Sequence, residues 1–268
     1  MESKYITIEG KSLHYLESGK GHRLLIAIHG YGNDASIFEP FVKHLEKDYV
    51  MVFLDLPHHG NTHWKDQGKI SKELLAAFIF ALMRNYQVEQ ISLLGYSVGG
   101  RVCLCLTEEM SPLITECVLV APDGLRFNPF YYFVTKNGCG KWIFRKFLSQ
   151  QKHLKWIDRV HRLNWIDLKK YKFLMRYLGS QEERDLLYKR WNDLALLVPD
   201  NKLLRRRILQ HTVPLTIFMG KNDNIIPPSK AQVFMKGLSC VQLHLLDKGH
   251  RMLDAESVPV IAQTFLKK

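Results

Sequence analysis

The feature that most restricts the fold of this chain is a set of short, almost continuous apolar runs. They occupy residues 23–30, 49–57, 90–97 and 116–122, and the strand pattern returns at residues 213–220 and 240–246. A strand that is buried on both faces has such a run, whereas a strand with one wet face alternates apolar and polar residues. Helical patterns separate the runs, for example at residues 71–86, which begin with a serine that can cap the helix. The sequence therefore predicts an α/β fold with a mostly parallel central sheet flanked by helices.

The chain begins differently from the rest of this pattern. Residues 4–9 and 12–17 alternate apolar and polar side chains on either side of Gly10-Lys11. Alternation around a turn signal is typical of an antiparallel hairpin. We expect the sheet to begin with this hairpin.

Residues 124–211 interrupt the alternation of strands and helices. They contain no clean strand run, and their apolar and basic residues recur at helical spacing. We interpret this segment as a helical cap inserted into the sheet domain. The predicted organisation is a core in two parts, residues 1–123 and 212–268, with the cap (lid) at 124–211 between them.

The basic charge of the protein is concentrated in the predicted cap. Residues 124–211 hold 20 Lys or Arg and 7 Asp or Glu, a net charge of +13, while the whole chain carries +12. Basic residues interleaved with aromatic ones suit an anionic membrane surface or an anionic substrate. The alternative is a solvated basic face over an aromatic core. The tryptophans of this segment are Trp142, Trp156, Trp165 and Trp191.

No nucleic-acid-binding module is present in the sequence, so we expect no nucleic acid partner.

Other features limit the cofactors and the compartment. The five cysteines are odd in number, three lie in apolar segments and none form a CxxC pair, so we expect reduced buried thiols and no zinc site. His58, His59 and His63 with Asp55 lack a recognised metal-ligand spacing, which favours a structural loop. We expect no cofactor. The first residues do not resemble a signal peptide and no run is long enough to cross a membrane, so we expect a cytoplasmic protein.

One serine stands between glycines at the end of a buried run, in the stretch LLGYSVGGR. Gly95 precedes Ser97 by two residues and Gly99 follows it by two. A sharp turn from strand to helix forces strained backbone angles and excludes larger side chains on both flanks. The serine would then stand at a helix N-terminus, where negative charge is favoured. The alternative is a Ser-Gly turn without chemistry.

A serine nucleophile needs a base and a carboxylate that holds the base. His250 lies just after the last predicted strand, and Asp223 lies in the loop after the preceding one. Asp123, directly after the run 116–122, is an alternative carboxylate, although its position favours a role in shaping the turn. The backbone N–H groups of Tyr31 and Val98 are candidates for an oxyanion hole.

With these motifs in this order, the chain resembles the α/β-hydrolase superfamily in its lidded branch. The resemblance implies that Ser97 is the nucleophile, His250 the base, Asp223 the acid, and Tyr31 and Val98 the oxyanion donors. Serine at the nucleophile position disfavours the dehalogenase and epoxide-hydrolase branches, which use Asp. Residues 55–62, DLPHHGNT, resemble the family's D-x-P-G-x-G-x-S loop but have His58 and Thr62 in place of Gly and Ser, which puts the backbone shape of this loop in question.

The resemblance leaves three functions open. The leading hypothesis is a serine hydrolase that acts on a carboxylic ester or a related small acyl compound. A second is a lyase, because the stretch with Arg101 also resembles the menaquinone-pathway synthases, which use the same triad on an anionic substrate. A third is a binding protein that retains the fold without turnover.

Overall fold

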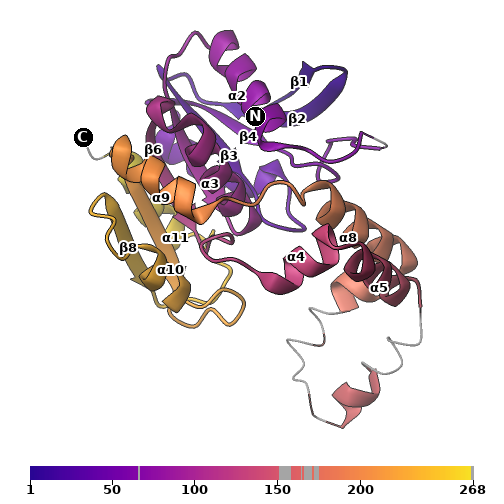
Figure 1. Cartoon of the computed structure of the whole chain (residues 1–268). Coiled ribbons are helices and arrows are strands. Elements are labelled where there is room, and N and C mark those ends of the chain that lie inside the picture. Colours follow the sequence, from indigo (N-terminus) through magenta and orange to yellow (C-terminus); the bar gives the residue numbers. More distant parts are fainter. Residues whose placement is uncertain (66, 151–157, 164, 166–170, 172–174, 267–268) are drawn as a thin grey trace. The chain divides into compact units, whose positions relative to one another are not determined.

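The computed structural model describes residues 1–65, 67–150, 158–163, 165, 171 and 175–266. Its centre is an eight-stranded sheet in the order β1-β2-β4-β3-β5-β6-β7-β8 (Figure 1). The strands are β1 Glu2–Ile8, β2 Lys11–Ser18, β3 Arg23–Ile28, β4 Tyr49–Leu54, β5 Ile91–Tyr96, β6 Ile114–Val120, β7 Leu215–Gly220 and β8 Val241–Leu246. Every predicted strand is present, which confirms the predicted fold class.

The direction of the strands also agrees with the sequence patterns. The first two form an antiparallel hairpin in which Ile8 pairs with Lys11, and β2 is antiparallel to β4. All other neighbouring pairs, from β4 through β8, are parallel. Because parallel strands end at the same edge of a sheet, the loops after β3, β5, β7 and β8 share that edge.

Helices flank the sheet within the same compact unit. They are α1 Val42–Leu45, α2 Lys72–Asn85, α3 Val98–Met110, α9 Asn201–Gln210, α10 Ser229–Phe234 and α11 Ser257–Leu266, with 3₁₀ turns at Ala35–Phe41 and Ser111–Leu113. The predicted serine cap is confirmed, because the hydroxyl of Ser71 accepts the N–H of Leu74 at 3.2 Å. Two residues after the end of this helix, Gln87 has a left-handed conformation, φ 54°.

The core of this unit lies on both faces of the central strands. Every residue of β5 is buried, as the continuous apolar run predicts. On one face, Phe38 and Phe41 of the first 3₁₀ turn and Phe265 of α11 pack with the strand residue Phe53. This packing fixes the strand ends that carry the candidate site. Cys103, Cys105 and Cys117 are buried free thiols, as expected, whereas the expectation of burial is wrong for Cys139, which is exposed, and for Cys240, which is half-buried.

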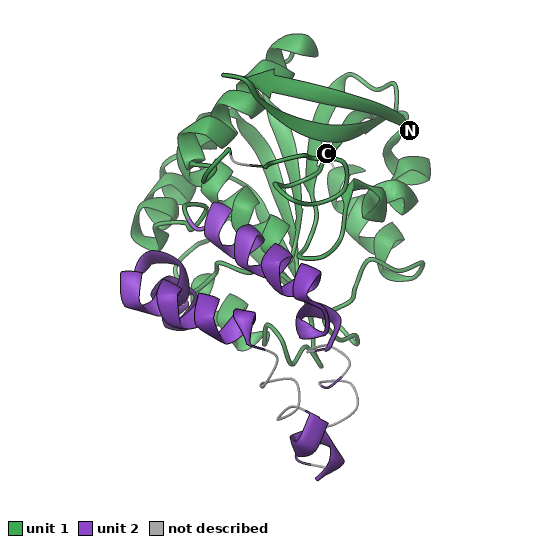
Figure 2. Ribbon diagram, turned by 90° about the vertical axis from the view of Figure 1, so that its right-hand side faces the viewer, with its two compact units in different colours: residues 1–127, 196–268 green, residues 128–195 purple. Residues whose placement is uncertain are grey.

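The chain divides into two compact units, residues 1–127 with 196–268 and residues 128–195 (Figure 2). The second unit contains α4 Pro129–Lys136, α5 Gly138–Ser149 and α8 Gln181–Asp193. Within it, Phe144 stacks on Trp191 at 5.3 Å, and buried Arg184 donates to the carbonyl of Leu148 at 2.7 Å. The described residues of this unit form helices and turns.

The compact units differ from the segments expected from the sequence. Helix α9, within the predicted cap segment 124–211, belongs to the sheet unit and packs against α3. That residues 124–211 form a cap stays a prediction. Trp156 lies outside the described residues. No helix among the described residues is long and apolar enough to cross a membrane.

Candidate functional site

The turn between β5 and α3 has the strained geometry that the glycine spacing predicts. Ser97 has φ 52° and ψ −113°, a conformation that is rare for a residue with a side chain. A Cβ on Gly99 would lie 1.8 Å from the carbonyl oxygen of Ile28, so no larger residue fits there. Hydrogen bonds hold the turn, because the Ser97 N–H donates to Val120 and its carbonyl accepts the N–H of Asp123, both at 2.9 Å.

Three side chains from separate loops meet at this turn. His250, in the loop after β8, lies with Nε2 3.0 Å from Oγ of Ser97. Its Nδ1 lies 2.7 Å from Oδ2 of Asp223, in the loop after β7. The three residues are 27 and 153 positions apart in the sequence, so it is the shared sheet edge that brings them together.

The surroundings of Asp223 keep its carboxyl group ionised. Burial raises the pKa, but the hydrogen bond from His250 and the backbone N–H groups of Ile226 and Ile225 outweigh this effect, so the pKa lies below its usual value. An ionised carboxylate can only accept, so Nδ1 of His250 donates to it. The lone pair on Nε2 is then directed to the hydroxyl of Ser97, the arrangement that general-base activation requires.

The alternative carboxylate, Asp123, makes different contacts. Its Oδ2 lies 3.2 Å from Nη1 of Arg101, and its Oδ1 accepts the N–H of Gly124 at 2.8 Å. Asp123 therefore shapes the turn after β6 and pairs with Arg101, whereas the described contact to His250 comes from Asp223. Arg101 itself is buried.

Both candidate oxyanion donors border Ser97. Val98 is the first residue of α3, and the first N–H groups of a helix have no partner within the helix. The loop after β3 carries Gly30 and Tyr31, and a Cβ on Gly30 would lie 3.2 Å from Cβ of Ser97. Val98 thus follows Ser97 in the chain, and the residue before Tyr31 lies close to Ser97; that the two N–H groups form an oxyanion hole stays a prediction.

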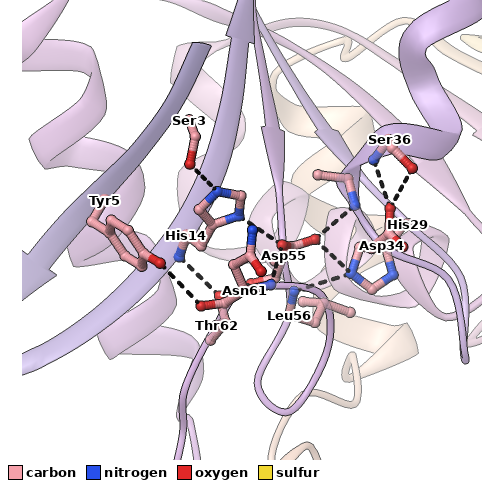
Figure 3. Close-up of polar contacts among 11 residues, drawn as sticks. Ser3, Tyr5, His14, His29, Asp34, Ser36, Asp55, Leu56, Asn61 and Thr62 are labelled. Carbon is pink, nitrogen blue, oxygen red and sulfur yellow. Dashed lines mark hydrogen bonds and ion pairs between the residues drawn. The ribbon is translucent and has the colours of Figure 1, made fainter. Parts of the chain in front are cut away.

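A buried carboxylate, Asp55, fixes the loop after β3 (Figure 3). Its Oδ1 accepts the N–H of Ala35 at 2.6 Å, and its Oδ2 accepts the N–H of Asn61 at 2.9 Å. His29 links the same loops, because its Nδ1–H donates to the carbonyl of Gly30 at 2.8 Å while its Nε2 accepts the N–H of Leu56 at 3.1 Å. That pattern requires a neutral imidazole. The sequence interpretation missed these roles of Asp55 and His29.

The same carboxylate belongs to a second Ser–His–Asp arrangement (Figure 3). His14 Nδ1 donates to Oδ2 of Asp55 at 2.7 Å, and its Nε2 lies 2.8 Å from Oγ of Ser3. Ser3 is an exposed residue of the extended strand β1. It therefore lacks the strained turn and the helix N-terminus that Ser97 has, although the hydrogen bonds match.

The loop that carries Asp55 contains the two departures from the family pattern, His58 and Thr62. His58 adopts φ 62°, a conformation that glycine takes without strain. The hydroxyl of Thr62 donates to the carbonyl of Asp55 at 2.8 Å.

Among the residues that the structure describes, no group of three or more His, Cys, Asp or Glu side chains is arranged to hold a metal ion.

The order of strands and the strained serine turn define the class of the protein. The model of the α/β hydrolase fold family matches residues 23–254. The chain belongs to this family, and its relatives include hydrolases.

Among these relatives, an uncharacterised hydrolase of Bacillus subtilis is 22% identical over 225 residues, which is 82% of this chain and 81% of the relative. The 2-hydroxy-6-oxononadienedioate/2-hydroxy-6-oxononatrienedioate hydrolase of Escherichia coli is 22% identical over 92% of this chain and 89% of its own length. The crystal structure of a hydrolase from Pseudomonas aeruginosa superposes with a TM-score of 0.70 and 17% identity, covering 99% of this chain and 98% of that one.

Proposed function

We propose that this α/β hydrolase is a serine hydrolase that cleaves a carboxylic ester or a related small acyl compound. The observation that carries the proposal is the continuous hydrogen-bonded series from Ser97 through His250 to Asp223, with distances of 3.0 and 2.7 Å, at a strained turn that opens a helix. A serine that only shapes a turn needs neither a histidine at its hydroxyl nor an ionised carboxylate behind it.

The proposed reaction has two steps. In the first, Oγ of Ser97 attacks the acyl carbon while His250 Nε2 takes the hydroxyl proton, and then gives that proton to the leaving alcohol. The product is an acyl-enzyme. In the second, water attacks the acyl carbon, His250 takes a proton from the water, and the serine oxygen leaves with that proton as the acid is released. Asp223 holds the imidazole in the tautomer that both steps need.

Backbone groups would stabilise the charge that forms in each step. A tetrahedral intermediate places negative charge on the former carbonyl oxygen, and we assign its stabilisation to the N–H groups of Tyr31 and Val98. Loss of one such donor costs on the order of 10²–10³ in turnover in other serine hydrolases. No metal or organic cofactor takes part in this scheme.

A panel of nitrophenyl esters of increasing acyl length tests the proposal. The wild-type chain should hydrolyse part of the panel, and Ser97→Ala should abolish turnover while its circular dichroism spectrum stays unchanged. The substrate in the name of the Escherichia coli relative, 2-hydroxy-6-oxononadienedioate, belongs in the same panel, because that relative matches most of the chain. Its hydrolysis would extend the substrate class beyond esters.

Two other outcomes would replace the proposal. Elimination from an anionic substrate without ester hydrolysis would favour the lyase, although the side chain on which that resemblance depends, Arg101, is ion-paired with Asp123. Ligand binding without any turnover would favour a non-catalytic binding protein.

A further inference from the structure

Helix α5 has apolar residues on two of its faces. Gly140, Phe144 and Leu148 recur every four residues and form the packed face, where Phe144 stacks on Trp191 of α8. On the other face, Trp142 is 61% exposed and Phe147 is 38% exposed. A surface helix normally has polar residues outside its packed face, so large apolar side chains that are exposed there are unusual.

The neighbouring helix α4 extends the same character. It packs against α5 within the unit 128–195. The exposed apolar residues of the two helices are Phe130, Tyr132, Phe133, Trp142, Ile143 and Phe147. Scattered single apolar residues are common on surfaces, whereas we interpret six of them on two helices that pack together as a candidate interaction site.

The charged side chains of the segment that forms α4 and α5 have one sign. Residues 124–150 contain five Lys or Arg side chains and no Asp or Glu. Lys141, Arg145 and Lys146 lie on α5 itself. The ammonium group of Lys146 lies 4.8 Å from the ring centre of Trp142, so cation and aromatic ring occupy one small area. We call these ten residues of α4 and α5, the six apolar ones with Lys136, Lys141, Arg145 and Lys146, the aromatic-basic surface.

We propose that the aromatic-basic surface binds the surface of an anionic lipid bilayer. Aromatic rings enter the headgroup region, while Lys and Arg side chains reach the lipid phosphates and carboxylates. A free anionic substrate would explain the cations, but not six exposed apolar side chains. A bilayer surface explains both. This inference does not depend on the proposed hydrolase activity.

Co-sedimentation of the full-length chain with lipid vesicles tests the proposal. Vesicles of phosphatidylcholine with phosphatidylserine should bind the protein, vesicles of phosphatidylcholine alone should bind it much less, and added salt should release it. Failure to bind anionic vesicles at low salt would overturn the proposal. In that case a variant effect on KM for anionic esters would assign the charge to substrate binding instead.

A charge variant locates the surface. Lys141→Gln, Arg145→Gln and Lys146→Gln together should weaken binding about 100-fold, because each cation near an anionic membrane contributes about fivefold. The matched control changes the exposed lysines Lys20, Lys43 and Lys47 of the sheet unit to Gln. It removes the same charge and should keep near wild-type binding. Equal losses in both variants would show that only the overall charge matters and would overturn the proposal.

An apolar variant tests the second half of the argument. Trp142→Ser should weaken binding about tenfold, since the ring no longer enters the headgroup region. Phe80→Ser is the matched control, because Phe80 is an aromatic residue of α2 that is 46% exposed. If Trp142→Ser binds as tightly as Phe80→Ser, the rings do not contact the bilayer and the proposal fails.

Discussion

Replacing Asp55 by Asn should destabilise the protein although the two side chains have almost the same size. Oδ1 of the carboxylate accepts one backbone N–H, from Ala35, and Oδ2 accepts another, from Asn61. An amide has only one oxygen, so either orientation of the new side chain leaves a donor without its acceptor, at one side the buried N–H of Ala35 and at the other the N–H of Asn61 together with the buried ring of His14. A buried donor that loses its partner costs about 1–3 kcal/mol. We therefore expect the free energy of unfolding to fall by about 2 kcal/mol.

Urea unfolding followed by circular dichroism measures this loss. A change of this size lowers the midpoint by about 1 M urea. Asp34→Asn is the control, because Asp34 caps the 3₁₀ turn by accepting the N–H of Ser36 at 2.9 Å, which an Asn oxygen also does. Turnover should fall as well in Asp55→Asn, since the network holds the loop that carries Tyr31. Equal midpoints for the two variants would refute the reasoning.

Three further predictions follow from the described contacts. Asp223→Asn should cost about 10⁴ in ester turnover, because the imidazole loses its required tautomer, whereas Asp123→Asn should cost far less; comparable losses in kcat for both variants would contradict the assignment. The folded pKa of Asp223 is lowered, so its contribution to the free energy of unfolding is present above about pH 4 and is lost as the pH falls through the folded value. Urea midpoints should therefore fall more steeply with acid in the wild type than in Asp223→Asn. Parallel curves for the two proteins would contradict the lowered pKa. Gln87→Gly should raise the free energy of unfolding by about 1 kcal/mol. Gln87 is the left-handed residue after α2, and the N–H of the next residue, Val88, donates to the carbonyl of Met83, as in a glycine-terminated helix. An unchanged thermal midpoint would show that the backbone at this position is not strained.

The sheet could be predicted from the sequence because a strand that is buried on both faces has a continuous apolar run. The continuous apolar runs predict β3 to β7, and the alternation around Gly10 predicts the hairpin. The spacing of Gly95 and Gly99 predicts the turn at Ser97, because only a strained turn excludes side chains on both flanks. The proximity of Asp223 and His250 also follows, since both come directly after predicted parallel strands.

The hydrogen-bond network around Asp55 could not be predicted from the sequence in the same way. Its partners come from β2, from the loop after β3 and from its own loop, so they meet only when the strand order is known. An aspartate after a buried strand has the same local pattern whether it is buried or exposed. Pairing of His14 with Ser3 depends on the register of β1 against β2, which side-chain alternation does not fix in detail.

The most direct test of the account is covalent labelling with a fluorophosphonate, followed by intact-mass measurement and peptide mapping. We expect one adduct, on Ser97, and none on Ser3, whose hydroxyl makes the same kind of hydrogen bond but lies on an extended strand. Ser97→Ala should remain unlabelled, and His250→Ala should label far more slowly. An unlabelled wild-type chain, or an adduct that persists in Ser97→Ala, would contradict the claim that the turn after β5 carries an activated nucleophile.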